Sequence, residues 1–247
     1  MASVEEHYEG LLARHYTWMR GDYEDRVREN RELFERLGIR PEYGGAALDL
    51  GCGSGFQSVA LARLGFRAVG VDSSGTLLAE LGEKAAPDLD ISTVKGDLRK
   101  TSLYRDRGPF EVVVCMGDTL THLGSRQEVR LLLKDLYHMV EPKGWVVLQF
   151  RDMTTALEGS ERAIPVRMEE NRIMATFLEY EAGRVNVHDM IFSREGSGWT
   201  MHRSAYAKLR LDAGEVAGFM EEAGFKATER YEEAGFSIVR GRRQARP

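Results

Sequence analysis

The sequence is poor in the features that mark secreted, membrane-spanning and nucleic-acid-binding proteins. It has only two cysteines, Cys52 and Cys115, without a CxxC pair or neighbouring histidines, so we expect free thiols and no metal site. No apolar run approaches the about 20 residues that a membrane-spanning helix needs, and residues 1–10 are polar and acidic rather than signal-like. Lys and Arg number 34 against 39 Asp and Glu, so no general positive charge attracts phosphates. We therefore expect a cytoplasmic protein with no membrane and no nucleic acid as partner.

The composition is that of a globular chain, with 43% hydrophobic and 30% charged residues. Apolar residues at helical spacing over residues 4–37 predict two helices separated by Gly21 and Asp22. From Ala46 onward, short apolar runs alternate with helical stretches, which is typical of β-α units and a parallel sheet. The expected strands are 46–50, 67–71, 91–94, 110–116 and 144–150, and the expected helices are 56–64, 74–85 and 125–140, the last ending at residues 141–144.

A β-rich stretch over residues 162–210 interrupts the α/β pattern. Gly183 and the run 196–198 separate its apolar stretches, which predicts antiparallel hairpins or a meander. A helix at 212–223 and strands at 226–231 and 236–240 then close the larger sheet. The predicted domains are an N-terminal helical cover (1–44), an α/β core (45–161 and 211–247) and an inserted antiparallel β lid (162–210).

The most specific local pattern is the run Asp49 to Gly55, which reads Asp-Leu-Gly-Cys-Gly-Ser-Gly between a strand and a helix. Such glycines permit a tight turn and let a ligand lie against bare backbone at a helix N-terminus. A dinucleotide fingerprint would need glycine at position 56, where this chain has Phe56. The spacing therefore disfavours an NAD-dependent oxidoreductase.

This run resembles the first motif of the class I S-adenosylmethionine-dependent methyltransferases. The resemblance implies an α/β, Rossmann-like, mostly parallel seven-stranded sheet with helices on both faces, and S-adenosylmethionine as cofactor with S-adenosylhomocysteine as product. Asp72 ends the second strand, where it can accept hydrogen bonds from both ribose hydroxyls, and Asp97 with the adjoining backbone would receive the adenine. The expected cofactor-binding residues are Tyr16, Arg26, Asp49, Gly51, Cys52, Gly53, Gly55, Asp72, Ser73, Asp97, Leu98 and Met116.

A closer resemblance lies after the fourth strand. Residues 117–123 are similar to the Gly-Asn-Ser-x-x-His-Leu segment of glycine and sarcosine N-methyltransferases, with Asp118 where that family has asparagine. The same resemblance gives Tyr16 and Arg26 the places that hold the methionine part of the cofactor. Arg151 takes the place of an arginine that binds the substrate carboxylate, although a structural ion pair with Asp152 or Asp118 is the alternative.

The acceptor end has several candidate residues. Asp118 and His122 are the predicted catalytic residues, as optional proton acceptors, although His122 could instead cap or pack its loop. The predicted substrate-binding residues are Arg151, Thr119 and Tyr206. Alternation on strand 199–209 places Tyr206 with His202 and Ser204; either face could border the pocket, and we favour solvent exposure of this polar one.

The leading hypothesis is methyl transfer to an amine nitrogen of a small molecule. Residues 116–119 lack the Asn/Asp-Pro-Pro-aromatic motif of enzymes that methylate DNA bases, which counts against a base as substrate. O- or C-methylation of a metabolite is the enzyme alternative, and a non-catalytic, cofactor-binding regulatory subunit is the alternative of another class. The expected partner is a small-molecule methyl acceptor, and a homodimer is left open.

Overall fold

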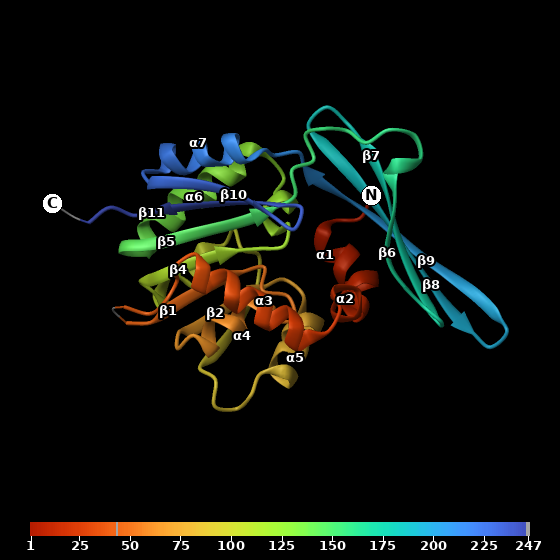
Figure 1. Cartoon of the computed structure of the whole chain (residues 1–247), viewed down its shortest axis with the longest axis horizontal. Coiled ribbons are helices and arrows are strands. Elements are labelled where there is room, and N and C mark those ends of the chain that lie inside the picture. The colour runs from red at the N-terminus through yellow and green to blue at the C-terminus, as the bar shows by residue number, and fades with distance from the viewer. Residues whose placement is uncertain (43, 246–247) are drawn as a thin grey trace.

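The computed structural model describes residues 1–42 and 44–245, and its strands form one large and one small sheet (Figure 1). Within the described residues, seven strands run in the order β10-β11-β5-β4-β1-β2-β3. Strands β1 to β5 are parallel, whereas β11 is antiparallel to both β5 and β10. The expected seven-stranded, mostly parallel sheet is confirmed. Its strands are β1 (Ala46–Leu50), β2 (Arg67–Asp72), β3 (Ile91–Lys95), β4 (Phe110–Cys115), β5 (Val140–Phe150), β10 (Lys226–Glu233) and β11 (Phe236–Arg242).

Helices cover both faces of this sheet, which explains why β1 and β4 are buried along their whole length. Helices α3 (Tyr23–Arg36), α4 (Phe56–Arg63) and α5 (Gly75–Lys84) pack on one face through residues such as Phe34 and Leu81. Helices α6 (Arg126–Met139) and α7 (Ala213–Ala223) pack on the other through residues such as Leu133 and Phe219. Short helical turns are η2 (Thr101–Leu103), η3 (Arg105–Arg107), η4 (Thr119–His122) and η5 (Gly159–Arg162). None of the described helices is both long enough and apolar enough to cross a membrane.

Strand β5 begins earlier than the sequence pattern predicts. Val140 already pairs with Phe110, and the next pair joins Trp145 to Val112, so residues 141–144 form a bulge within the strand. The proline and glycine of this segment therefore mark an irregularity in the strand, where a loop was expected. Gly144 suits the bulge because an added Cβ would lie 2.7 Å from the carbonyl oxygen of Glu111.

The N-terminal segment forms two helical stretches, as expected, although the first is composite. Helix α1 (Val4–His7), the π-helical turn η1 (Tyr8–Leu12) and α2 (Ala13–Arg20) follow one another without a break. Gly21 ends the stretch with a φ of 104°, and the Asp22 side chain caps α3 by accepting a hydrogen bond from the Asp25 amide. Figure 1 shows α1 and α2 between the core and the second sheet.

The second sheet lies in the chain between β5 and α7. Its strands are antiparallel, in the order β6 (Ala163–Glu169), β7 (Arg172–Tyr180), β8 (Arg184–Glu195) and β9 (Gly198–Leu209). We call this four-stranded sheet the insert. Its inner face packs on the N-terminal helices, where Met174 and Ile191 contact Leu11 and Leu12.

The expectation that Tyr206 lies on a solvent-exposed face of β9 is wrong. Tyr206 is 3% exposed, because its ring packs against the His7 ring of α1 at a centroid distance of 4.2 Å. His7 in turn contacts Asp189 of β8, at 3.0 Å between Nε2 and Oδ2. A polar cluster covered by the N-terminal helix thus makes this the inner face, and Met201 points outward with an exposed fraction of 46%.

Candidate cofactor pocket and acceptor site

A pocket of about 310 Å³ lies where the parallel strands end, beside the point between β1 and β4 at which the strand order reverses. Small-molecule pockets span about 300–1,000 Å³, so the volume suits a compact ligand. The lining combines the loops after β1 to β4 with the start of the chain. The residues that line it are Ser3, Val4, Glu5, Tyr8, Tyr16, Gly51, Gly53, Val71, Asp72, Ser73, Leu77, Gly96, Asp97, Leu98, Arg99, Gly117, Thr119, His122, Leu123 and Gly124.

The glycine loop forms the floor of the pocket. The amides of Gly51 and Cys52 both donate to the carbonyl of Val71, at 2.8 and 3.1 Å, which turns the chain tightly after β1. Gly51 has a φ of +71°, and an added Cβ would lie 2.3 Å from Cγ2 of Thr119. Only glycine therefore lets the loop approach η4 this closely.

The N-terminal helices hold the same loop from the other side. The Thr17 hydroxyl donates to the Ser54 hydroxyl and the Tyr23 hydroxyl donates to the Ser54 carbonyl, both at 3.0 Å. Tyr16 lines the pocket beside Gly53, whose added Cβ would lie 3.3 Å from Cε1 of the ring. Residues far from the loop in sequence thus complete the pocket wall.

Asp72 presents its carboxylate to the pocket at the end of β2. Its Oδ2 accepts a hydrogen bond from the Gly53 amide and its Oδ1 accepts one from the Ser74 amide, both at 2.8 Å. Burial raises the pKa of Asp72, although these backbone hydrogen bonds act to lower it. Ser73 lines the pocket next to it. The fixed carboxylate retains lone pairs that can accept hydroxyl hydrogen bonds.

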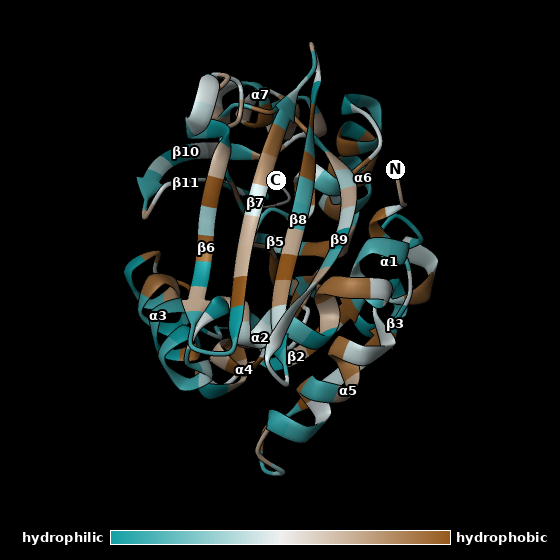
Figure 2. Ribbon diagram, turned by 90° about the vertical axis from the view of Figure 1, so that its right-hand side faces the viewer, coloured by the Kyte–Doolittle hydropathy of each residue, from teal (hydrophilic) through white to brown (hydrophobic). Residues whose placement is uncertain are grey.

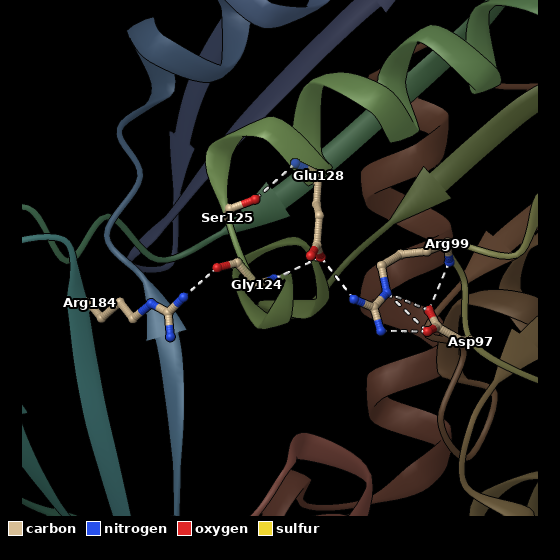
Figure 3. A network of polar contacts seen from close by, with 6 residues as sticks. All are labelled: Asp97, Arg99, Gly124, Ser125, Glu128 and Arg184. Carbon is tan, nitrogen blue, oxygen red and sulfur yellow. Dashed lines mark hydrogen bonds and ion pairs between the residues drawn. The ribbon is translucent and has the colours of Figure 1, made fainter.

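Asp97 anchors the next wall through a network that includes Arg99 (Figure 3). The Arg99 guanidinium donates to both oxygens of Asp97 and, through Nη1, to Glu128 at 3.0 Å. Burial would raise the pKa of Asp97, but the hydrogen bonds from Arg99 outweigh it, and this pKa lies below its usual value. Glu128 also accepts the Gly124 amide, and Arg184 of β8 donates to the Gly124 carbonyl at 2.5 Å. The network therefore joins this end of the pocket to the insert.

The other end of the pocket holds Thr119 and His122 of η4 together with Tyr8. The His122 ring lies edge-on to the rings of Tyr8 and Tyr206, with centroid distances of 5.8 and 5.5 Å. Burial above all, with the charge of Lys208, lowers the pKa of His122 to about 3, so the imidazole is neutral at neutral pH. Its Nε2 is buried and has no hydrogen-bond partner among the described residues.

Asp118 lies behind this end of the pocket rather than in it. Its carboxylate accepts hydrogen bonds from the Arg151 amide at 2.7 Å, from Arg151 Nη1 at 2.5 Å and from Lys208 Nζ at 2.9 Å. Burial would raise the pKa of Asp118, but the facing charges of Lys208 and Arg151 outweigh it and hold this pKa well below its usual range. The guanidinium of Arg151 is thus in an ion pair with Asp118, which was the structural alternative for this arginine, and substrate binding by Arg151 stays a prediction.

Several predicted cofactor residues lie outside the pocket lining. Asp49 is buried, accepts the Ser58 hydroxyl at 2.7 Å, and has its pKa raised to about 7 by burial. Arg26 pairs with Glu29 on the helix surface at 2.5 Å. Three more of the predicted cofactor residues do not line the pocket. Cys52 and Met116 are buried in the core beneath it, and Gly55 forms the turn that begins α4.

Sequence reasoning missed Tyr8, Arg99 and Lys208. Arg99 carried a local signal, since it stands two residues after Asp97 on the same turn. Lys208 comes from the insert, 90 residues from Asp118, and the only hint was its position two residues after Tyr206 on the same strand face. Within the described ranges, no cluster of His, Cys, Asp and Glu side chains could hold a metal ion.

Comparison with known proteins agrees with this arrangement. The family described as "methyltransferase domain" matches residues 47–144. The chain is 31% identical over 140 residues to a glycine/sarcosine N-methyltransferase of Parasynechococcus marenigrum. The aligned residues make up 56% of this chain and 49% of that protein. The chain spans about half the length of the curated relatives it matches.

Solved structures share the fold across most of the chain. The CcbJ methyltransferase of Streptomyces caelestis has a TM-score of 0.75 at 23% identity, covering 88% of this chain and 90% of that one. CalS10, an amino pentose methyltransferase of Micromonospora echinaspora, has a TM-score of 0.70 at 20% identity, covering 92% and 94%. The glycine loop and the acidic residues after β2 and β3 lie within residues 47–144, the part of the chain that matches the methyltransferase-domain family, and the chain as a whole has the fold of these methyltransferase structures.

Proposed function

We propose that the chain transfers the methyl group of S-adenosylmethionine to an amine nitrogen of a small molecule. The observation that carries the proposal is the continuity of the pocket from Asp97 and Asp72 to the η4 residues Thr119 and His122. The chemistry of the lining suits a nucleoside, because carboxylates can accept from ribose hydroxyls and from an adenine amino group. Relatives that methylate the nitrogen of glycine and sarcosine support an amine acceptor.

In this proposal the chain holds the cofactor through residues already in place. Asp72 takes the ribose, Asp97 and the Leu98 backbone take the adenine, and Tyr16 covers the methionine part beside Gly53. When bound, S-adenosylmethionine supplies a methyl group on a positively charged sulfur, which leaves as a neutral thioether. The protein's main contribution is orientation, which can be worth about 7–11 kcal/mol of the barrier.

The acceptor must present a lone pair, so it must enter as the neutral amine. The nitrogen forms its bond to the methyl carbon as the carbon–sulfur bond breaks, and the resulting ammonium then loses its proton to solvent or to a nearby base. The His122 imidazole is neutral at neutral pH, so it does not repel an acceptor by charge. It can accept a hydrogen bond from a neutral amine. The ion-paired cluster of Asp118, Arg151 and Lys208, in which only Arg151 is exposed, carries one net positive charge, and this charge disfavours the ammonium form of the acceptor.

A turnover assay with mass spectrometry tests the proposal. The chain is incubated with S-adenosylmethionine and, in turn, glycine, sarcosine, an amino sugar and a catechol. We expect S-adenosylhomocysteine and a methylated product from an amine only, with activity lost in Asp72→Ala and retained in Gly82→Ala, whose added Cβ meets nothing within 4 Å. Methylation of the catechol alone, or cofactor binding without product from any acceptor, would contradict the proposal.

A further inference from the structure

Apart from Arg162 of η5, whose guanidinium lies 4.9 Å from the centre of the Phe177 ring, no other part of the described chain is seen to cover the outer face of the insert. On β7 the inner residues Met174 and Thr176 are buried, whereas the outer residues Ile173, Ala175 and Phe177 are partly exposed. Figure 2 looks directly at this face and shows no helix or strand in front of β6 to β9. The insert thus has one face against the N-terminal helices and one face open.

One row of this open face is apolar across all four strands. Met168 of β6 pairs with Ile173, Ile173 with Phe192, and Phe192 with Met201 of β9, so one row of side chains is entirely apolar. Met168 and Met201 are 68% and 46% exposed. The two neighbouring rows continue the face and form a shallow hollow, lined by Ala163, Phe177, His188, Met190, Arg203, Ser204 and Ala205.

The size of the face lies at the low end of what specific protein interfaces bury, about 1,200 Å² when both partners are counted. Four strands about 4.8 Å apart, with nine residues at about 3.4 Å each, give a face of roughly 600 Å². A standard interface buries about 800 Å² on each partner, and monomers rarely expose apolar patches larger than a few hundred Å². A partner that covers the whole sheet is therefore expected.

The distribution of charge favours a second copy of the chain as that partner. In a twofold interface the residues near the axis meet their own copies, so like charges at the centre would repel. The two central strands, β7 and β8, present only His188 as a titratable side chain among the outer residues of the three rows, and Arg203 lies on the edge strand β9. His188 is itself paired with Glu179, at 3.2 Å.

We propose that the outer faces of two inserts pack against each other to form a twofold homodimer. Packed sheets lie about 10 Å apart with their side chains interdigitated, which would bury Met168, Phe192 and Met201 of each copy. The inner face of the same sheet carries Tyr206, whose ring packs on the pocket residue His122, and Lys208, which pairs with Asp118 behind the pocket. The dimer would therefore hold the insert in the position in which it completes the site.

Sedimentation velocity on the full chain tests this proposal by mass, independently of methyl transfer. We expect the protein to sediment at twice its chain mass of 27.8 kDa. Phe192→Glu should raise the dissociation constant by about a hundredfold or more, because each dimer would bury two unpaired carboxylates. The matched control is Leu131→Glu, which changes a leucine of α6 that is 53% exposed and should leave the dimer intact.

Circular dichroism and binding of S-adenosylhomocysteine establish that each variant is folded. If Phe192→Glu fails to fold, Met201→Glu takes its place, because that side chain is already 46% exposed and on the edge strand. A wild-type chain that stays at 27.8 kDa over the accessible concentration range would overturn the proposal. So would a dimer that survives a folded outer-face variant, since the interface would then lie elsewhere.

Discussion

Replacing Asp118 by asparagine leaves two cations facing a neutral amide in a buried place. Asp118 and Lys208 are only 3% and 7% exposed, and their side chains meet at 2.9 Å. The Arg151 side chain is 45% exposed, so water can solvate its charge, whereas it cannot reach the Lys208 ammonium as easily. Breaking a buried ion pair by removing one partner costs about 3–5 kcal/mol, and we expect Asp118→Asn to fall near the lower end.

A second substitution, Lys208→Met, removes the ammonium group that Asp118→Asn would leave without an ionic partner. It keeps an apolar side chain at this position, so the effect of the charge can be measured apart from that of packing. Alone it should cost about 1.5–3 kcal/mol, the usual value of a hydrogen bond to a charged group, because Asp118 keeps its contacts with Arg151. In the double variant neither buried charge remains unpaired, so its free energy of unfolding should exceed that of Asp118→Asn alone. The two costs should therefore fail to add by about 1.5 kcal/mol or more.

The same pair predicts a dependence on pH with a definite sign. Because the folded-state pKa of Asp118 is depressed, the wild type has this stabilisation above the unfolded value of about 3.9 and loses it as the pH falls through the folded pKa. The double variant Asp118→Asn/Lys208→Met has no carboxylate at this position, so its stability does not fall with pH for this reason. Urea denaturation followed by tryptophan fluorescence, at neutral pH and at about pH 3, measures both effects. Additive costs at neutral pH, with parallel acid sensitivity, would refute the reasoning.

Three further predictions concern the pocket. Asp72→Ala should weaken S-adenosylhomocysteine binding by about 10- to 100-fold, the loss of about 1.5–3 kcal/mol of charged hydrogen bonding, and unchanged affinity in calorimetry would count against the ribose role. Gly55→Ala should lower the melting temperature strongly, because the φ of +92° disfavours an L side chain and the added Cβ would lie 2.1 Å from Leu81; Gly82→Ala, in open space, should not, and equal melting temperatures would contradict this. Because burial lowers the pKa of His122 to about 3, the unfolded chain binds a proton below about 6.5 that the folded chain does not. Stability should thus fall as the pH drops from 6.5 toward 3, and His122→Gln should fall less steeply in urea titrations; identical slopes would argue against a buried neutral imidazole.

The core strands could be predicted closely from the sequence because burial on both faces leaves a continuous run of apolar residues within each strand. Strand β4 is covered on both faces, so its apolar residues run without interruption and mark its extent. The start of β5 could not be found in this way, because Pro142 and Gly144 ordinarily end a helix with a loop. Here they sit in a bulge that pairs with β4, which only the register between the two strands reveals.

The pocket was predictable where its residues follow directly after a strand. Asp72 and Asp97 stand at the ends of β2 and β3, and parallel strands bring such ends to one edge of the sheet. The acceptor end was less predictable, because it is assembled from distant segments. Tyr8 comes from the N-terminal helix and Lys208 from the insert, and the orientation of the insert follows from the His7–Asp189 contact rather than from alternation on β9.

The central claim is that this pocket binds the S-adenosyl group. Isothermal titration calorimetry of the full chain with S-adenosylhomocysteine, and with NAD as the competing cofactor class, measures it most directly. We predict saturable heat for one S-adenosylhomocysteine per chain and no binding of NAD, because Phe56 replaces the glycine that a dinucleotide loop needs. Folded protein that releases no heat with S-adenosylhomocysteine, or that binds NAD instead, would contradict the account.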